Sequence, residues 1–187
     1  VALVVIILAI ILIASLGGGG GTSPLLYRKN DELFAYGLKG DPFMISDDYD
    51  SYGSLTVDES NLFYTDSGEY SSSGYTLYKL YYRDVNNAES KLKDADPEKG
   101  LLVSKDVYSF RTAGKTVVYL KDMSDSGGKL RYNDLKNDEV SIDSDVKSFR
   151  LSSDGKKVVY LKDKDGELTL YEVNLSKPDE KTKIASD

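Results

Sequence analysis

The residues with the clearest chemical potential in this sequence are carboxylates gathered in short polar stretches. Asp163, Asp165 and Glu167 surround Gly166, which resembles the start of a calcium-binding loop. The glutamate that ends such a loop and ligates the ion with both oxygens is missing. The sequence therefore favours a solvated turn here over a calcium site. The same two interpretations apply to two other acidic stretches, one formed by Asp47, Asp48 and Asp50 and the other by residues 122–125.

Most catalytic chemistries lack the residues they need. Cysteine and histidine are both absent, which excludes disulfides, thiol nucleophiles, Ser-His-Asp arrangements and zinc sites built on these residues. A pair of carboxylates could hydrolyse a glycosidic bond, but no pair stands out among the 31 acidic residues. We therefore predict that the chain is not an enzyme and holds no metal or cofactor.

Three tyrosines recur at one position of an internal repeat. They are Tyr64, Tyr119 and Tyr160. They could line a ligand-binding face, because rigid aromatic side chains are frequent anchors at interfaces. Positions that repeat in this way are more often packing positions, and the sequence favours that interpretation.

The elements that must position these residues form a repeat of about 40 residues, a length typical of propeller blades. Residues 114–122 and 155–163 have almost the same sequence, and residues 107–111 resemble residues 146–150. Each copy contains four short β-type runs separated by turn residues such as Gly155. Four strands in a repeat of this length indicate a β-propeller blade.

The predicted fold is therefore all-β, a partial β-propeller of roughly three and a half four-stranded blades. The repeats cover residues 25–187, as a half blade at 25–47 and three blades at 51–103, 104–143 and 144–187. So few blades do not complete an ordinary ring of about four to eight. We expect an open, curved stack with exposed edges, and a natural protein that continues past Asp187.

Two stretches of the last copy resemble a known family. Residues 149–160 and 166–175 are similar to the TolB-type, WD-like propeller repeat, whose pattern is F-x-x-S-P-D-G-K, an apolar strand, and then G-x-x-x-L-Y-x-x-D-L. Ser153 stands in place of the usual proline. The chain also looks like repeat domains found outside a single membrane span in Gram-positive surface proteins. The resemblance implies a fold more readily than an activity.

The first 16 residues have a different character from the repeats. Residues 1–16 are apolar except for Ser15 and carry no charge. As a helix they would be about 24 Å long, slightly short of a bilayer core of about 30 Å. We predict a single-pass transmembrane helix, followed by a glycine-rich linker at 17–24. A cleaved signal peptide is the main alternative, and a buried core helix is disfavoured because the segment is apolar on every face.

The overall charge narrows the range of partners. A net charge of -7 disfavours nucleic acid, because proteins that bind it present basic surfaces to the phosphates. The sequence predicts a non-catalytic binding or scaffold module, held at the cell membrane by residues 1–16 with its repeats outside the cytoplasm. Its ligand would be a protein, a peptide or a cell-wall component. The alternative is the accessory propeller of a larger envelope hydrolase whose catalytic domain lies outside this segment.

Overall fold

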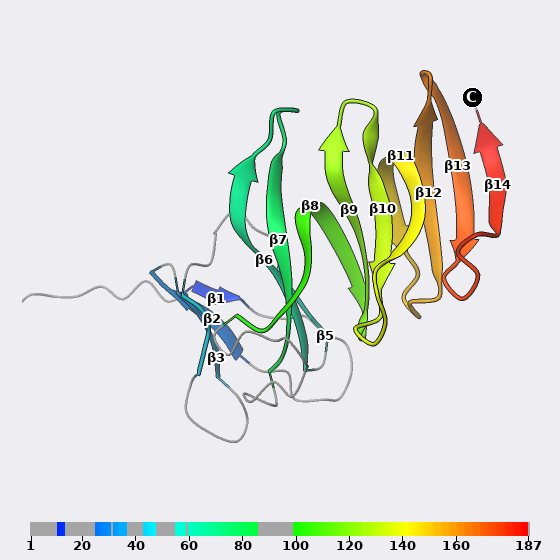
Figure 1. Ribbon diagram of the computed structural model, residues 1–187. Coiled ribbons are helices and arrows are strands. Elements are labelled where there is room, and N and C mark those ends of the chain that lie inside the picture. Colours follow the sequence, from blue (N-terminus) through cyan, green and yellow to red (C-terminus); the bar gives the residue numbers. More distant parts are fainter. Residues whose placement is uncertain are drawn as a thin grey trace, which may run out of the picture.

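The structure, a computed structural model, is built entirely of strands and connections in the residues it describes. These are residues 11–13, 25–30, 32–36, 43–47, 55–58, 60–85 and 99–186. Within these ranges there is no helix, which confirms the all-β prediction. Figure 1 shows the strands following one another in chain order, and within each sheet every strand pairs with the strands next to it in the sequence.

The strands form two antiparallel sheets. The first sheet has four strands: β1 (Ile11–Ile13), β2 (Leu25–Lys29), β3 (Glu32–Tyr36) and β4 (Phe43–Ser46). The second sheet has ten strands: β5 (Leu55–Asp58), β6 (Asn61–Tyr70), β7 (Thr76–Asp84), β8 (Leu101–Ala113), β9 (Thr116–Ser124), β10 (Gly127–Asn133), β11 (Val140–Leu151), β12 (Lys157–Lys164), β13 (Glu167–Asn174) and β14 (Lys181–Ser186).

The two long strands β8 and β11 each belong to two consecutive four-stranded units. The first part of β8 pairs with β7 and its second part with β9, and β11 divides its pairing in the same way between β10 and β12. Asp106 (φ 59°) and Asp145 (φ 58°) lie where the pairing changes. A single left-handed residue of this kind bends a strand, and aspartate tolerates that conformation better than most residues. Each bend lets one strand leave a unit and begin the next.

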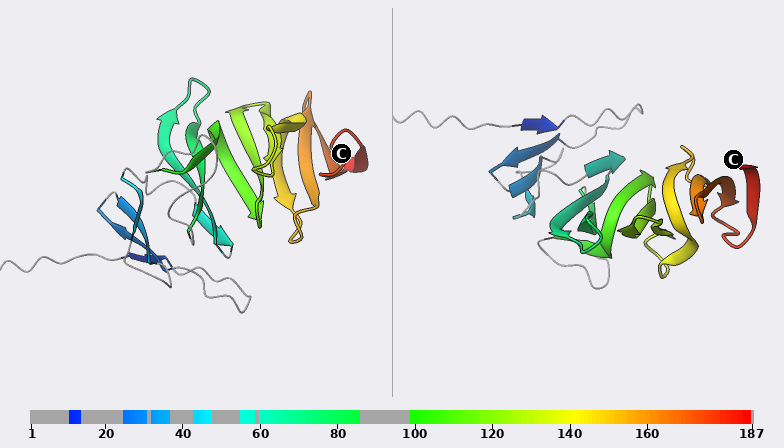
Figure 2. Two further views of the ribbon diagram at one scale, coloured as in Figure 1. Left: turned by 60° about the horizontal axis from the view of Figure 1, so that its bottom comes forward. Right: turned by 90° about the horizontal axis from the view of Figure 1, so that it is seen from above.

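These divisions give four units in a row. Unit 1 is β1 to β4, unit 2 is β5 to β7 with the first part of β8, unit 3 runs from the second part of β8 to the first part of β11, and unit 4 is the rest of the second sheet. Figure 2 shows the row as open and curved, with β1 to β3 at one end and β14 at the other.

Residues 11–13 differ from the sequence-based expectation. They form β1, which pairs with β2 through Leu12 opposite Tyr27, so the helix predicted there is not found. Isoleucine favours strands, and β2 would otherwise present an unpaired edge. β1 also adds a strand to the predicted half blade at 25–47, which is therefore part of a four-stranded unit. The described residues contain no helix long and apolar enough to cross a membrane. Residues 1–10, and the predicted linker at 17–24, lie outside the described residues.

The hydrophobic core lies between the units. Tyr64 packs towards unit 1, with Leu26 and Leu33, whereas the adjacent Phe63 packs towards unit 3. In β9, Tyr119 likewise packs towards unit 2, whereas the adjacent Val118 packs towards unit 4. Successive side chains of a strand point to opposite faces, and both faces of these strands are covered. Their sequences are consequently apolar throughout, without alternation.

Candidate functional site

The three tyrosines singled out by the sequence are buried. Tyr64, Tyr119 and Tyr160 are 0%, 0% and 1% exposed and occupy equivalent positions in β6, β9 and β12. Each ring lies between its own unit and the preceding one. The rings therefore pack inside the structure, and their hydroxyl groups reach polar groups at the junctions between units.

Between units 3 and 4 the polar group is Asp143. Its carboxylate accepts hydrogen bonds from the Tyr160 hydroxyl (2.7 Å) and the Lys162 ammonium (2.6 Å), and the Lys181 ammonium lies 3.0 Å away. Burial alone would raise the pKa of Asp143, but the hydrogen bonds from Lys162, Tyr160 and Lys181 hold it at about 2. Burial and the Asp143 charge raise the pKa of Tyr160. The group is therefore an anion held by two cations and a neutral phenol.

Between units 2 and 3 the same arrangement uses a different carboxylate. Ser104 precedes the bend of β8 as Asp143 precedes the bend of β11, but it carries no charge. Glu139 supplies the carboxylate and accepts hydrogen bonds from the Tyr119 hydroxyl and from Ser104. The Lys121 ammonium lies 3.6 Å from it. Burial and the neighbouring Glu139 raise the pKa of Tyr119.

Between units 1 and 2 an acidic residue takes the place of the lysine found in the later units. Asp66, which is fully buried, takes the position that Lys121 and Lys162 hold in the later units, two residues after the tyrosine. The Lys99 ammonium lies 3.2 Å from its carboxylate. The Tyr64 hydroxyl donates to the Lys99 carbonyl oxygen at 2.5 Å. Each interface between consecutive units therefore places a buried tyrosine beside a lysine–carboxylate pair.

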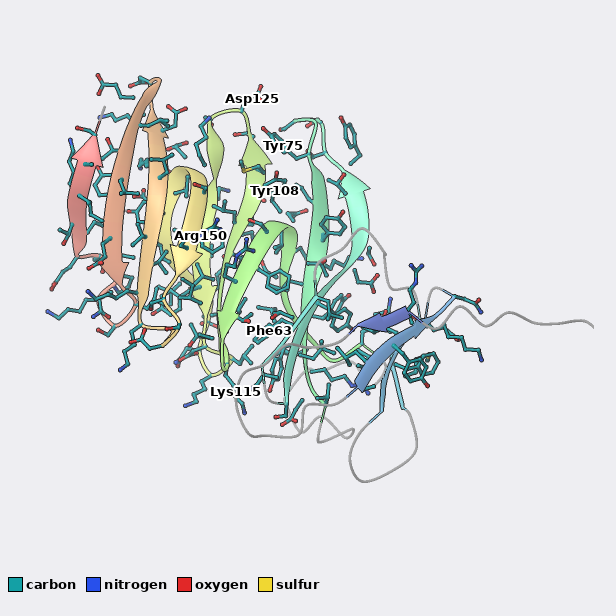
Figure 3. All side chains as sticks on the ribbon, turned by 180° about the vertical axis from the view of Figure 1, so that it is seen from behind. Phe63, Tyr75, Tyr108, Lys115, Asp125 and Arg150 are labelled. Atoms are coloured by element: carbon teal, nitrogen blue, oxygen red, sulfur yellow. The ribbon has the colours of Figure 1, made fainter. Side chains whose placement is uncertain are left out.

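A second group of tyrosines, which the sequence did not single out, is exposed. Tyr70 is 79% exposed at the end of β6, and Tyr108 is 43% exposed in β8 just after its bend. The Tyr75 ring packs edge-on against Tyr108, with 5.5 Å between ring centres. Figure 3 shows Tyr75 and Tyr108 together at the end of the sheet that also carries Asp125, opposite the end that carries Lys115. We call Tyr70, Tyr75 and Tyr108 the tyrosine edge.

Backbone hydrogen bonds shape the turn that positions Tyr70 and Tyr75. The turn between β6 and β7 is closed by Ser71, whose backbone N–H donates to the Tyr75 carbonyl oxygen (2.8 Å) and whose carbonyl oxygen accepts from the Gly74 N–H (3.1 Å). Gly74 adopts φ 84°, a conformation that glycine reaches without strain. The sequence contained a signal for this surface, since tyrosines flank the polar stretch at residues 71–74. Tyr108 also stands where the next repeat has Lys147.

Comparison with known proteins supports the fold. No protein-family model matches the chain, and neither does any curated protein. Among solved structures, a putative TolB from Agrobacterium tumefaciens matches with a TM-score of 0.51 at 14% identity, covering 88% of this chain and 58% of that one. This chain has a TolB-like fold. It spans little more than half of that TolB structure.

Two other solved structures match with lower TM-scores than the TolB structure from Agrobacterium tumefaciens. The TolB from Acinetobacter baumannii gives a TM-score of 0.48 at 13% identity over 83% of this chain and 39% of that chain. The tricorn protease gives 0.47 at 15% identity over 91% of this chain and 20% of that chain.

The acidic stretches considered as calcium sites are engaged in other contacts in this TolB-like fold. Asp163 accepts a hydrogen bond from the Gly166 N–H (2.9 Å) and forms an ion pair with Lys147 (3.0 Å). Asp47 lies 3.4 Å from the Lys99 ammonium, whereas residues 48 and 50 are outside the described residues. In the part of the chain that the structure describes, no group of three or more acidic side chains is arranged to hold a metal ion.

Proposed function

We propose that this chain is a non-catalytic binding or scaffold module of the cell envelope, which binds a protein or peptide at the tyrosine edge. The observation that supports the proposal is the exposure of Tyr70 and Tyr108 on one end of the sheet. Tyrosine is enriched at protein interfaces and at their energetic centres. It offers a large contact area with few rotatable bonds, so little entropy is lost on binding.

The chemistry of the partner follows from the charge of the chain. The net charge of -7 favours a partner with basic residues and disfavours nucleic acid. Phenol rings also attract cations, so arginine or lysine side chains of a partner can lie over the exposed faces of the tyrosines. A basic protein segment or peptide therefore fits the tyrosine edge best.

Replacing Tyr70 and Tyr108 by serine is expected to weaken peptide binding at least tenfold while leaving the fold intact. The probes are peptides selected on the full chain from a displayed random 12-residue library, with affinities measured by fluorescence anisotropy. A tenfold change corresponds to about 1.4 kcal/mol, which is modest for two aromatic anchors. Both side chains are exposed, so their loss removes little core packing.

The matched control is Ile184→Ser, which removes an exposed apolar side chain from β14 at the far end of the row. It should leave the affinity of the selected peptides unchanged. If the tyrosine double variant binds the peptides as tightly as the wild type, the tyrosine edge is not the binding surface. The same conclusion follows if Ile184→Ser is the variant that loses binding.

A tether to the membrane is part of the proposal. The apolar, uncharged sequence of residues 1–16 supports it. The tether requires residues 11–13 to leave β1 and enter the bilayer. β1 is a short strand that pairs with β2 through only three residues. The repeats would then lie outside the cytoplasm, next to envelope partners.

Lysine at position 8 is expected to abolish membrane association of the full chain. A lysine at the centre of a membrane helix costs about 3 kcal/mol. The wild-type chain should remain in the membrane pellet after extraction with alkaline carbonate, whereas Leu8→Lys should be extracted. Arg28→Lys, which preserves the charge outside the apolar segment, is the control. Extraction of the wild-type chain by carbonate would contradict the tether and leave peptide binding unaffected.

A further inference from the structure

The bend of each long strand is followed by a valine and then by a residue that differs between the two strands. After the bend of β11 this residue is Lys147, and after the bend of β8 it is Tyr108. The valine before each of them pairs with a lysine at the matching position of the next strand, Lys162 in β12 and Lys121 in β9. Because the register is the same, Lys147 and Tyr108 occupy equivalent positions at two consecutive junctions between units.

Lys147 connects units 3 and 4. Its ammonium donates a hydrogen bond to the Asp125 carbonyl oxygen, at the tip of the β9–β10 hairpin of unit 3. It also forms an ion pair with Asp163 of unit 4, with 3.0 Å between the nitrogen and the carboxylate oxygen. At this junction a cation therefore lies between a hairpin tip and a carboxylate.

The junction of units 2 and 3 has the hairpin and the carboxylate but a ring in place of the lysine. The β6–β7 hairpin presents Tyr75, which packs edge-on against Tyr108, and Figure 3 shows both rings at the end of the sheet that carries Asp125. Asp122 follows the paired lysine of β9 as Asp163 follows that of β12. The two aspartates are therefore equivalent, whereas the ammonium group of the later junction is replaced by the half-exposed phenol ring.

Asp122 has the capacity to hold a further cation. Its Oδ2 atom accepts a hydrogen bond from the Lys129 ammonium (2.9 Å), and the side chains of Lys129 and Asp122 are 52% and 36% exposed. A carboxylate offers about four acceptor positions. Asp143 shows that one carboxylate of this chain holds two ammonium groups at once. Asp122 can therefore pair with a second cation without losing Lys129.

We propose that a cationic side chain of the bound peptide lies on Tyr108 and pairs with Asp122, and so takes the place that the Lys147 ammonium holds at the next junction. This inference rests on the function proposed above and makes Asp122 the residue that selects a basic partner at the tyrosine edge. The ring attracts the cation through its face. The carboxylate adds a charge-assisted hydrogen bond, which a neutral side chain of the peptide cannot match.

The charge of the chain as a whole does not select this place, because other carboxylates lie at the same end of the sheet. Asp163 is the equivalent of Asp122, but the chain itself supplies the cation beside it, from Lys147. The ring at position 108 leaves that role to a partner. A peptide cation is therefore expected beside Asp122 and not beside Asp163.

A double-mutant cycle on the full chain tests this contact. The variant Asp122→Asn/Lys129→Gln removes both members of the ion pair, so the net charge stays at -7. Each lysine or arginine of a library-selected peptide is replaced in turn by glutamine, and affinities are measured by fluorescence anisotropy. With the wild-type chain, the replacement of one of them, the anchor cation, should weaken binding about tenfold. With the variant the same replacement should cost about threefold, because only the ring remains.

The matched control is Lys157→Gln/Glu172→Gln in unit 4. This ion pair also spans 2.9 Å, and its side chains are 53% and 37% exposed, so its length, exposure and charge balance match those of the pair removed in the test. In this background the loss of the anchor cation should still cost about tenfold. If it costs about tenfold in both variants, the peptide cation does not pair with Asp122 and the inference is overturned.

The inference and the proposed function fail in different ways. If Tyr70→Ser/Tyr108→Ser loses binding but no peptide cation is coupled to the pair of Asp122 and Lys129, the peptide binds at the tyrosine edge without this contact. Selected peptides that contain neither lysine nor arginine would lead to the same conclusion. If the tyrosine double variant binds as tightly as the wild type, the tyrosine edge itself is not the binding surface. Circular dichroism of Asp122→Asn/Lys129→Gln should match the wild type, since both side chains lie at the surface.

Discussion

Alanine in place of Gly127 is expected to lower the free energy of unfolding by about 3 kcal/mol. Gly127 begins β10 with φ 121°, and a Cβ atom there would lie 2.6 Å from the Asp145 carbonyl carbon and 2.8 Å from the Val146 nitrogen. Both contacts are with backbone at the bend of β11, which pairs with strands on both sides and cannot move without breaking them. The cost combines an unfavourable backbone conformation with overpacking at the junction of two units.

Gly166→Ala separates these two contributions. Gly166 has φ 91° in the β12–β13 hairpin, but a Cβ atom there would have no other atom within 4 Å. Its substitution should cost about 1 kcal/mol, from backbone strain alone. Denaturant unfolding of the full chain in detergent, followed by circular dichroism, measures both values. Equal losses for the two variants would show that close packing at the bend of β11 is unimportant.

The repeat could be predicted from the sequence because each of its signals lies within a few neighbouring residues. Glycines such as Gly155 and Gly166 mark tight turns, and the runs around Tyr119 and Tyr160 are nearly identical. These features fixed the strand-rich class and the order of the units. The continuity of β8 and β11 was not predictable, because the bends at Asp106 and Asp145 resemble ordinary turn signals.

The candidate site was harder to predict because it depends on contacts between units. The recurrence of Tyr64 is visible in the sequence, but its burial requires unit 1 to cover it. Ser104 lacks the carboxylate that Asp143 has at the equivalent position, and Glu139 supplies it instead. These two residues are distant in the chain, so no local sequence pattern predicts their contact. The strand at residues 11–13 depends likewise on the open edge of β2, whereas the sequence alone favoured a membrane helix.

Asparagine in place of Asp143 is expected to lower the free energy of unfolding by about 2 kcal/mol at neutral pH. The pKa of Asp143 is about 2 in the folded chain, and that of an ordinary aspartate is about 3.9. A shift of this size corresponds to about 2.5 kcal/mol in favour of the charged form. Asparagine keeps the size of the side chain but cannot hold Lys162 and Lys181 as strongly. Tyr160 keeps a hydrogen-bond acceptor, so the expected loss comes mainly from the charge.

The pH dependence identifies the cause of that loss. A carboxylate whose pKa is lowered on folding stabilises the folded state above its unfolded pKa of about 3.9, and this contribution disappears as the pH falls through about 2. The wild type and Asp143→Asn should therefore differ most near neutral pH, and their stabilities should converge between pH 4 and pH 2. Glu139→Gln is the matched control, because the Glu139 side chain is 30% exposed and that of Asp143 is 9% exposed. Solvent screens the more exposed pair, so its loss should be smaller. If the difference between wild type and Asp143→Asn stays constant down to pH 2, the effect arises from packing and the buried charge does not stabilise the junction of units 3 and 4.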